Sequence, residues 1–191
     1  MPRRAVKLAR GEWYHLYNRG HNRGLIFFER ENYLFFLRQL KHYVLPALDV
    51  AAFCLMPTHY HLLGRVTQAG LSHSMQLFSI SYTKAMNERY DRAGGLFQGA
   101  FQGKHVGRDN YLTHLSRYIH LNPVRAGLVA RPTEWEFSSY REYVGARNGE
   151  LPRPELVLSL FRSISDYQDF VESYAADQDG LIAGLLFEEA D

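Results

Sequence analysis

Hydrophobic and polar residues alternate between positions 12 and 18, which is the period of a β-strand. A helical period follows over 29–44 and would end before Pro46, since proline cannot continue a helix. The strand would place Trp13, His15 and Tyr17 on one face and Tyr14 and Leu16 on the other, and the helix is marked by Tyr33, Phe36, Leu37, Leu40 and Val44.

Two β-rich apolar stretches, 49–56 and 59–66, lie on either side of a Pro-Thr turn. They predict an antiparallel hairpin. A second helical period covers 71–92, where Gly94 and Gly95 would stop it. A loop and a further strand are expected over 96–106.

A third helix is predicted over 109–121, closed by Asn122 and Pro123. The element order is then β-α-β-β-α-β followed by a helix. This order indicates an α+β fold, a ferredoxin-like sandwich with an antiparallel sheet, in which the third helix follows the last strand. The pattern predicts one domain over 1–147 and an acidic, partly helical extension over 148–191.

Composition supports a packed globular protein, because 46% of the 191 residues are hydrophobic. The apolar runs are too short to span a membrane, and no apolar stretch follows the basic N-terminal residues as in a signal peptide. The single cysteine, Cys54, lies in an apolar run and is expected to be a core residue. One thiol excludes an internal disulfide and suits a reducing, cytoplasmic location.

Charge is distributed unevenly along the chain. Residues 1–131 carry 18 lysines and arginines against 7 aspartates and glutamates, an excess of eleven positive charges. Residues 132–191 carry 4 against 13, an excess of nine negative charges. A basic body predicts a polyanionic partner for the first part of the chain.

The first candidate site is the histidine pair His59 and His61. Side chains two apart on a strand point to the same side, so two imidazoles would lie side by side as possible metal ligands. The pattern is also compatible with a buried structural pair, and a histidine pair alone does not decide between the two.

The third helix supplies the second candidate. His114, Tyr118 and Asn122 are spaced by four residues and therefore share one face of that helix. A tyrosine between an imidazole and an amide could be a reactive group, or it could pack at the edge of the sheet with its hydroxyl hydrogen-bonded.

Several motifs together resemble a known family. The segment Met56–Leu63 resembles the histidine-hydrophobic-histidine strand of the HUH endonucleases, and Arg117–Val129 is similar to the signature of the REP-associated tyrosine transposases. These are relatives of the single-tyrosine insertion-sequence transposases. The match also includes 14–20, 96–99 and 135–140, in the same order, over roughly residues 11–143.

The resemblance implies a mechanism. His59, His61 and Asn122 would bind Mg²⁺ or Mn²⁺, which would polarise the scissile phosphate of DNA. Tyr118 would attack the phosphorus, giving a 5′-phosphotyrosine and a free 3′-hydroxyl. A free tyrosine has a pKa of about 10 and needs help to react, for which His114 and Arg117 are the candidates.

Two positions depart from the family pattern. Tyr60 stands between the histidines where the family has a bulky hydrophobic residue; it would point to the other face of the strand and pack there. Ala100 stands where relatives often have a basic residue, and Lys104 is the next cation.

The expected partner is single-stranded or hairpin DNA, bound by basic groups beside aromatic side chains. Some relatives exchange catalytic helices between subunits and others act alone, so both a monomer and a homodimer are compatible with the resemblance. The predicted DNA-binding residues are Asn18, Arg19, Asn22, Arg23, Lys104, Arg108 and Arg125.

Two other functions fit part of the pattern. A ferredoxin-like sheet with basic loops resembles an RNA-binding surface and would need no nucleophile. A hydrolytic metalloenzyme could use the histidine pair to activate water. Only the transposase-like enzyme requires a covalent adduct between Tyr118 and DNA.

Overall fold

The computed structural model describes residues 6–107, 109–173 and 183–184. Its four strands form one antiparallel sheet in the order β2-β3-β1-β4, which confirms the prediction of a mixed α/β fold with an antiparallel sheet. The strands are β1 (Trp13–Arg19), β2 (Leu48–Met56), β3 (His59–Val66) and β4 (Gln102–His105). The helices are α1 (Arg30–Tyr43), α2 (Leu71–Arg89), α3 (Asp109–Arg125), α4 (Tyr140–Tyr143), α5 (Glu155–Leu158) and α6 (Ile164–Glu172), with short 3₁₀ helices η1 (His21–Arg23) and η2 (Pro132–Glu134).

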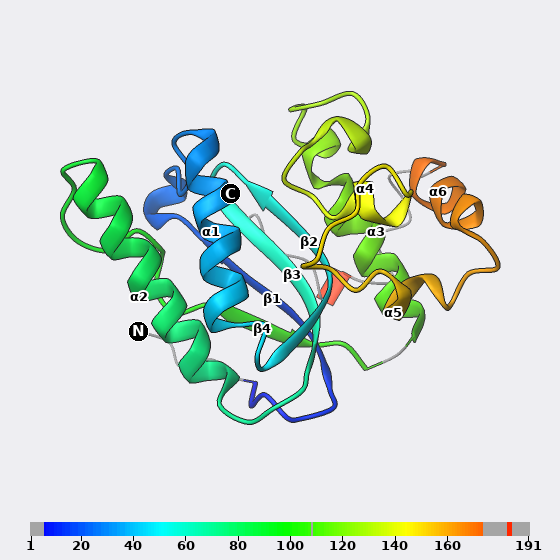
Figure 1. The fold of residues 1–191 in the computed structure, drawn as a ribbon, viewed down its shortest axis with the longest axis horizontal. Coiled ribbons are helices and arrows are strands. Elements are labelled where there is room, and N and C mark those ends of the chain that lie inside the picture. Colours follow the sequence, from blue (N-terminus) through cyan, green and yellow to red (C-terminus); the bar gives the residue numbers. More distant parts are fainter. Residues whose placement is uncertain (1–5, 108, 174–182, 185–191) are drawn as a thin grey trace.

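The sheet lies between two groups of helices. Helices α1 and α2 cover one face, and α3 with the later helices covers the other (Figure 1). Each face has its own cluster of buried hydrophobic residues. Within the described ranges, no helix combines the length and apolar character needed to cross a bilayer.

Strand β3 shows how the alternating pattern distributes side chains. Tyr60 and Leu62 are buried in the cluster beneath α1 and α2, and the ring of Tyr60 lies 5.1 Å from that of Phe36. Leu63, on the opposite side of the strand, belongs to the cluster beneath α3. Successive residues of a strand face opposite ways, so the residues flanking Tyr60 face α3.

The third helix extends further than its sequence predicted. It was expected to end at Leu121 before the Asn122-Pro123 pair, but α3 continues to Arg125 with Pro123 inside it. Because Pro123 falls in the last turn, it removes only one of the final hydrogen bonds of the helix. Gly127, with a φ of 67°, follows the end of the helix, a conformation that glycine adopts at little cost.

The described part of the predicted C-terminal extension contains two short helices, α5 and α6. Ser163 divides them, since its hydroxyl accepts a hydrogen bond from the Asp166 backbone N–H and starts α6. Val157 of α5 and Tyr167 of α6 are fully buried in the cluster beneath α3. The remainder of the extension, 174–182 and 185–191, lies outside the described residues.

A buried polar network joins α6 to α3. The Nδ1 atom of His120 lies 2.7 Å from the Tyr167 hydroxyl, and its Nε2 atom lies 2.7 Å from the Ser139 hydroxyl. Tyr167 also donates to the Ser116 hydroxyl at 3.1 Å. Buried polar groups whose hydrogen bonds are all satisfied favour a single packing arrangement. Helix α6 therefore helps to fix the orientation of α3 over the sheet.

Candidate functional site

The two predicted metal ligands lie side by side on β3 and face α3. His61 is fully buried and His59 is 9% exposed, with ring centroids 4.9 Å apart. The Nδ1 atom of each ring has a hydrogen-bonding neighbour: the Thr58 hydroxyl at 3.0 Å from His59, and Nε2 of His15 at 2.9 Å from His61. The Nε2 atoms, which are also buried, are therefore the ones that could bind a metal.

Burial keeps both histidines neutral at physiological pH. For His59, burial lowers the pKa to about 4; the nearby Asn122 side chain opposes this, and the charge of Arg19 adds to it. For His61, burial, with His59 and His15 close by, places the pKa well below its ordinary value. A neutral imidazole has a lone pair, which is the form that binds a metal.

Helix α3 brings the predicted nucleophile to this pair. The ring centroid of Tyr118 lies 5.7 Å from that of His61. One turn further on, the Asn122 amide nitrogen donates to the Tyr118 carbonyl oxygen at 2.9 Å, and the Asn122 side chain also hydrogen-bonds with His59. Because Asn122 also influences the pKa of His59, the strand and the helix meet at these four residues.

Arg125 lies beside Tyr118, the predicted nucleophile. Its guanidinium carbon lies 5.2 Å from the centroid of the Tyr118 ring, within range of a cation–π contact. The sequence predicted Arg125 as a DNA contact, and nothing in the structure tests that role. Its position places a permanent positive charge at the tyrosine.

The residues predicted to assist the tyrosine contact a different element. The Arg117 Nη2 atom lies 2.9 Å from Nδ1 of His114, and its guanidinium carbon lies 4.3 Å from the centroid of the Phe170 ring in α6. The His114 ring also contacts Phe170, at 5.3 Å. These contacts place both side chains on the side of α3 that packs against α6, and their assistance to catalysis stays a prediction.

The predicted DNA-binding residues lie on several elements. Asn18 is 5% exposed, and its amide donates to the Gly99 carbonyl at 3.1 Å. Arg19 hydrogen-bonds with Gln98. The exposed Asn22 and Arg23 of η1 have φ angles of 50° and 56°. Lys104 of β4 lies 6.0 Å from the centroid of the Tyr17 ring, and Arg108 falls outside the described residues.

Gly20 determines the shape of the loop over residues 20–24, which contains Asn22 and Arg23. A Cβ atom at Gly20 would come within 2.0 Å of the Gly24 carbonyl oxygen, so a larger residue would displace the turn. The Gly20 backbone N–H also donates to the Thr58 carbonyl at 2.7 Å. The loop is therefore anchored directly beside the histidine strand.

His15 was not identified from the sequence as a site residue. It is fully buried on β1, and its ring is inclined by only 26° to that of His61, at 5.1 Å between centroids. The alternation between positions 12 and 18 predicts which face of the strand His15 lies on, but it does not predict that His61 of the adjacent strand is its neighbour. In the sheet register, Tyr17 is opposite His61 and His15 is opposite Leu63, so His15 reaches His61 diagonally.

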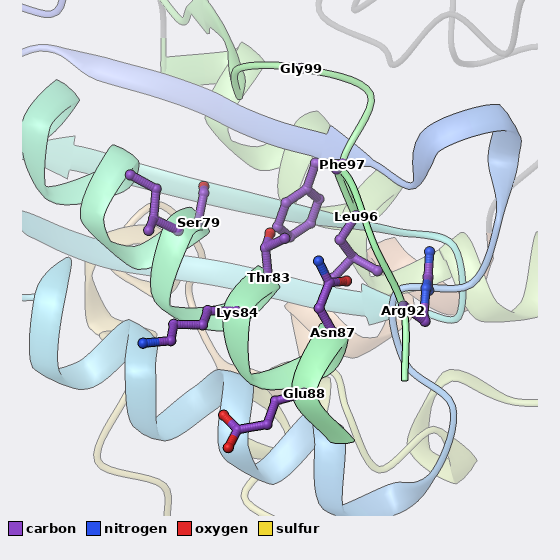
Figure 2. Close-up of a pocket in the computed structure, with 11 residues that line it drawn as sticks. Ser79, Thr83, Lys84, Asn87, Glu88, Arg92, Leu96, Phe97 and Gly99 are labelled. Carbon is purple, nitrogen blue, oxygen red and sulfur yellow. The ribbon is translucent and has the colours of Figure 1, made fainter. Parts of the chain in front are cut away.

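A groove of about 890 Å³ lies apart from this cluster, between α2 and segment 95–99. Figure 2 shows Thr83 and Asn87 of α2 facing Leu96 and Phe97 across it. Phe97 belongs to the cluster beneath α1 and α2. The groove is therefore on the other face of the sheet from the histidines, and its charged lining residues are Lys84, Glu88 and Arg92.

The donor set of the site suits a divalent cation with mixed ligands. Two neutral imidazoles and one amide oxygen would leave further positions for water or phosphate oxygens, which Mg²⁺ and Mn²⁺ prefer. Among the described residues no three histidine, cysteine, aspartate or glutamate side chains are grouped to bind a metal. The amide of Asn122 is the third protein ligand that the sequence predicted for such a site.

The lowered pKa values of the buried histidines predict a loss of stability in mild acid. Below about pH 6.5 an unfolded chain binds protons at these imidazoles, whereas the folded chain stays neutral until the pH nears 4 at His59 and 3 at His120. The free energy of unfolding should therefore fall as the pH is lowered through this window, on the order of 1–2 kcal/mol per histidine at pH 5, and stay level above pH 7.

Urea unfolding at pH 5 and pH 7.5 measures this change. The variant His73→Gln, altered at an exposed histidine of α2, should show the same pH dependence as the wild type. Equal stability of the wild type at both pH values would contradict the expectation.

Comparison with known proteins adds two similarities, and no family model matches the chain. A protein of Haemophilus influenzae named as a REP-associated tyrosine transposase is 25% identical over 109 residues, which cover 51% of this chain. The matching part spans 62% of the length of that relative.

A solved structure described as a REP-associated tyrosine transposase bound to a REP hairpin has a similar fold. It gives a TM-score of 0.62 at 16% identity and covers 80% of this chain and 98% of its own. Together, the two similarities confirm the resemblance that the sequence motifs predicted.

Proposed function

We propose that this chain is a transposase-like, metal-dependent nuclease and strand transferase that cuts single-stranded or hairpin-associated DNA through a covalent bond to Tyr118. The observation that carries the proposal is the meeting of His59 and His61 from β3 with Tyr118 and Asn122 from α3. The similarity to REP-associated tyrosine transposases supports a role in DNA transposition or in the processing of REP elements.

Two features support the finer assignments. The strand order β2-β3-β1-β4, with helices after the first and third strands, supports a ferredoxin-like sandwich. The histidine pair of β3 meets Tyr118 and Asn122 of α3 within a single chain. This supports a site that is complete in a monomer. The excess of positive charge over residues 1–131 supports DNA as the substrate of a cytoplasmic protein.

In the proposed reaction, Tyr118 attacks a phosphorus atom of the DNA backbone. Its hydroxyl oxygen forms the new P–O bond, the P–O3′ bond breaks, the phenol loses its proton, and the 3′ oxygen gains one. The positive charge of Arg125 beside the ring favours the phenolate. The retained phosphoester lets a 3′-hydroxyl displace the tyrosine later and rejoin the strand.

His59, His61 and Asn122 would hold the metal ion, which would polarise the scissile phosphate when bound. The neutral state of the two imidazoles, caused by burial, suits this role. The basic loop around Arg19 and Arg23 would bind backbone phosphates next to the site.

The proposal is tested with a labelled hairpin oligonucleotide carrying a single-stranded flank, incubated with the protein and Mn²⁺ and then separated under denaturing conditions. A band of protein bound to labelled DNA is expected. Trypsin and mass spectrometry should place the nucleotide on the peptide 118–125. Cleavage without an adduct would support a hydrolytic enzyme instead, and binding without cleavage would support a binding module.

A further inference from the structure

The hydrogen bond between His15 and His61 joins two fully buried imidazoles on neighbouring strands. Nε2 of His15 lies 2.9 Å from Nδ1 of His61. A neutral imidazole carries one proton, so one ring must donate and the other accept. Which ring donates decides which nitrogen of His61 keeps a lone pair.

Only one arrangement is compatible with metal binding through the buried Nε2 of His61. The His61 proton must then be on Nδ1, and that N–H donates to Nε2 of His15. His15 in turn carries its own proton on Nδ1. A histidine that binds a metal usually donates its other N–H to an acceptor, which fixes the tautomer and the ring orientation.

We infer that His15 is a positioning residue, which accepts a hydrogen bond from Nδ1 of His61 and thereby directs the lone pair on Nε2 of His61 toward the metal ion. The inference rests on the proposed function, because it assigns His61 as a ligand. His15 does not touch the DNA or the ion in this role.

The two ligand histidines are supported differently. His59 has the hydroxyl of Thr58 at 3.0 Å from its Nδ1 atom, and a hydroxyl can rotate to donate or accept. His61 has the rigid ring of His15, which stacks on the ring of His61 at 5.1 Å and contacts the ring of Tyr17, tilted by 41°, at 4.9 Å. The tautomer of His61 should therefore be more strictly defined than that of His59.

The first test needs no metal. Long-range ¹H–¹⁵N correlation spectra of the metal-free protein, with chelator present, report which ring nitrogen of each histidine is protonated. The expected result is a single tautomer of His61 with the proton on Nδ1, and a mixture of tautomers in His15→Leu. A wild-type His61 protonated on Nε2 would overturn the inference.

The second test measures Mn²⁺ affinity by calorimetry or by electron paramagnetic resonance. His15→Leu removes the acceptor while keeping an apolar side chain, and its dissociation constant should rise by about 10–100-fold. His15→Gln offers a carbonyl oxygen to the same N–H, and should stay within about threefold of the wild type. His73→Leu, at an exposed site on α2, controls for the loss of an imidazole.

The outcomes separate the inference from the function on which it rests. Wild-type affinity in His15→Leu would overturn the positioning role even if adducts still form. A wild type that binds no Mn²⁺ would contradict the proposed function, while the tautomer measurement would still decide the state of His61. If His15→Leu does not fold, the wild-type spectra and His15→Gln are sufficient for the decision.

Discussion

Replacing Tyr118 with phenylalanine should abolish the covalent adduct with DNA, with a loss of at least about a thousandfold in cleavage rate. The variant lacks the only atom that would form the bond to phosphorus. The phenylalanine ring can keep the packing that the tyrosine ring makes against His61 and Arg125. DNA affinity should therefore remain within about twofold of the wild-type value, as measured by fluorescence anisotropy.

Two further variants make this experiment specific. Tyr43→Phe, altered at a partly exposed tyrosine of α1, should form adducts at the wild-type rate. Arg125→Gln keeps the nucleophile but removes the neighbouring charge, so the adduct should still form, about 10–100-fold more slowly. If Tyr118→Phe still forms an adduct, another side chain is the nucleophile, and the role proposed for α3 is wrong.

The sequence predicted the parts of this site better than their assembly. The period of a strand places His59 and His61 on one face, and the period of a helix places Tyr118 and Asn122 one turn apart. Neither period reveals that β3 and α3 touch, since this depends on packing between segments about 60 positions apart. The similarity to a known family, not the spacing, predicted that contact.

Local spacing also does not fix which neighbours an individual side chain meets in the folded chain. Arg117 is next to Tyr118 in the chain, but neighbouring residues of a helix point about 100° apart, and the guanidinium of Arg117 contacts His114 and Phe170 of α6. Arg125, two turns along, reaches the tyrosine ring instead. His15 was missed because its link to His61 crosses between strands whose register the sequence alone does not specify.

Removing a proposed ligand is the second change with a large expected effect. His61→Ala takes away one of two imidazole donors, and neither the Asn122 amide nor a water molecule replaces a neutral nitrogen ligand at the same affinity. Mn²⁺ binding should fall by at least about 100-fold, and adduct formation at low micromolar Mn²⁺ should fall in proportion. DNA affinity without metal should stay near the wild-type value, because His61 is fully buried and cannot contact the backbone phosphates.

His42→Ala, altered at an exposed histidine at the end of α1, provides the matched control and should bind Mn²⁺ as the wild type does. High Mn²⁺ concentrations should partly restore adduct formation in His61→Ala, since a weakened site fills by mass action. A variant that lacks the nucleophile, Tyr118→Phe, should not recover at any metal concentration. This difference separates a residue that holds the ion from one that forms the bond, and a wild-type rate in His61→Ala with chelator present would show that Tyr118 reacts without a metal at this site.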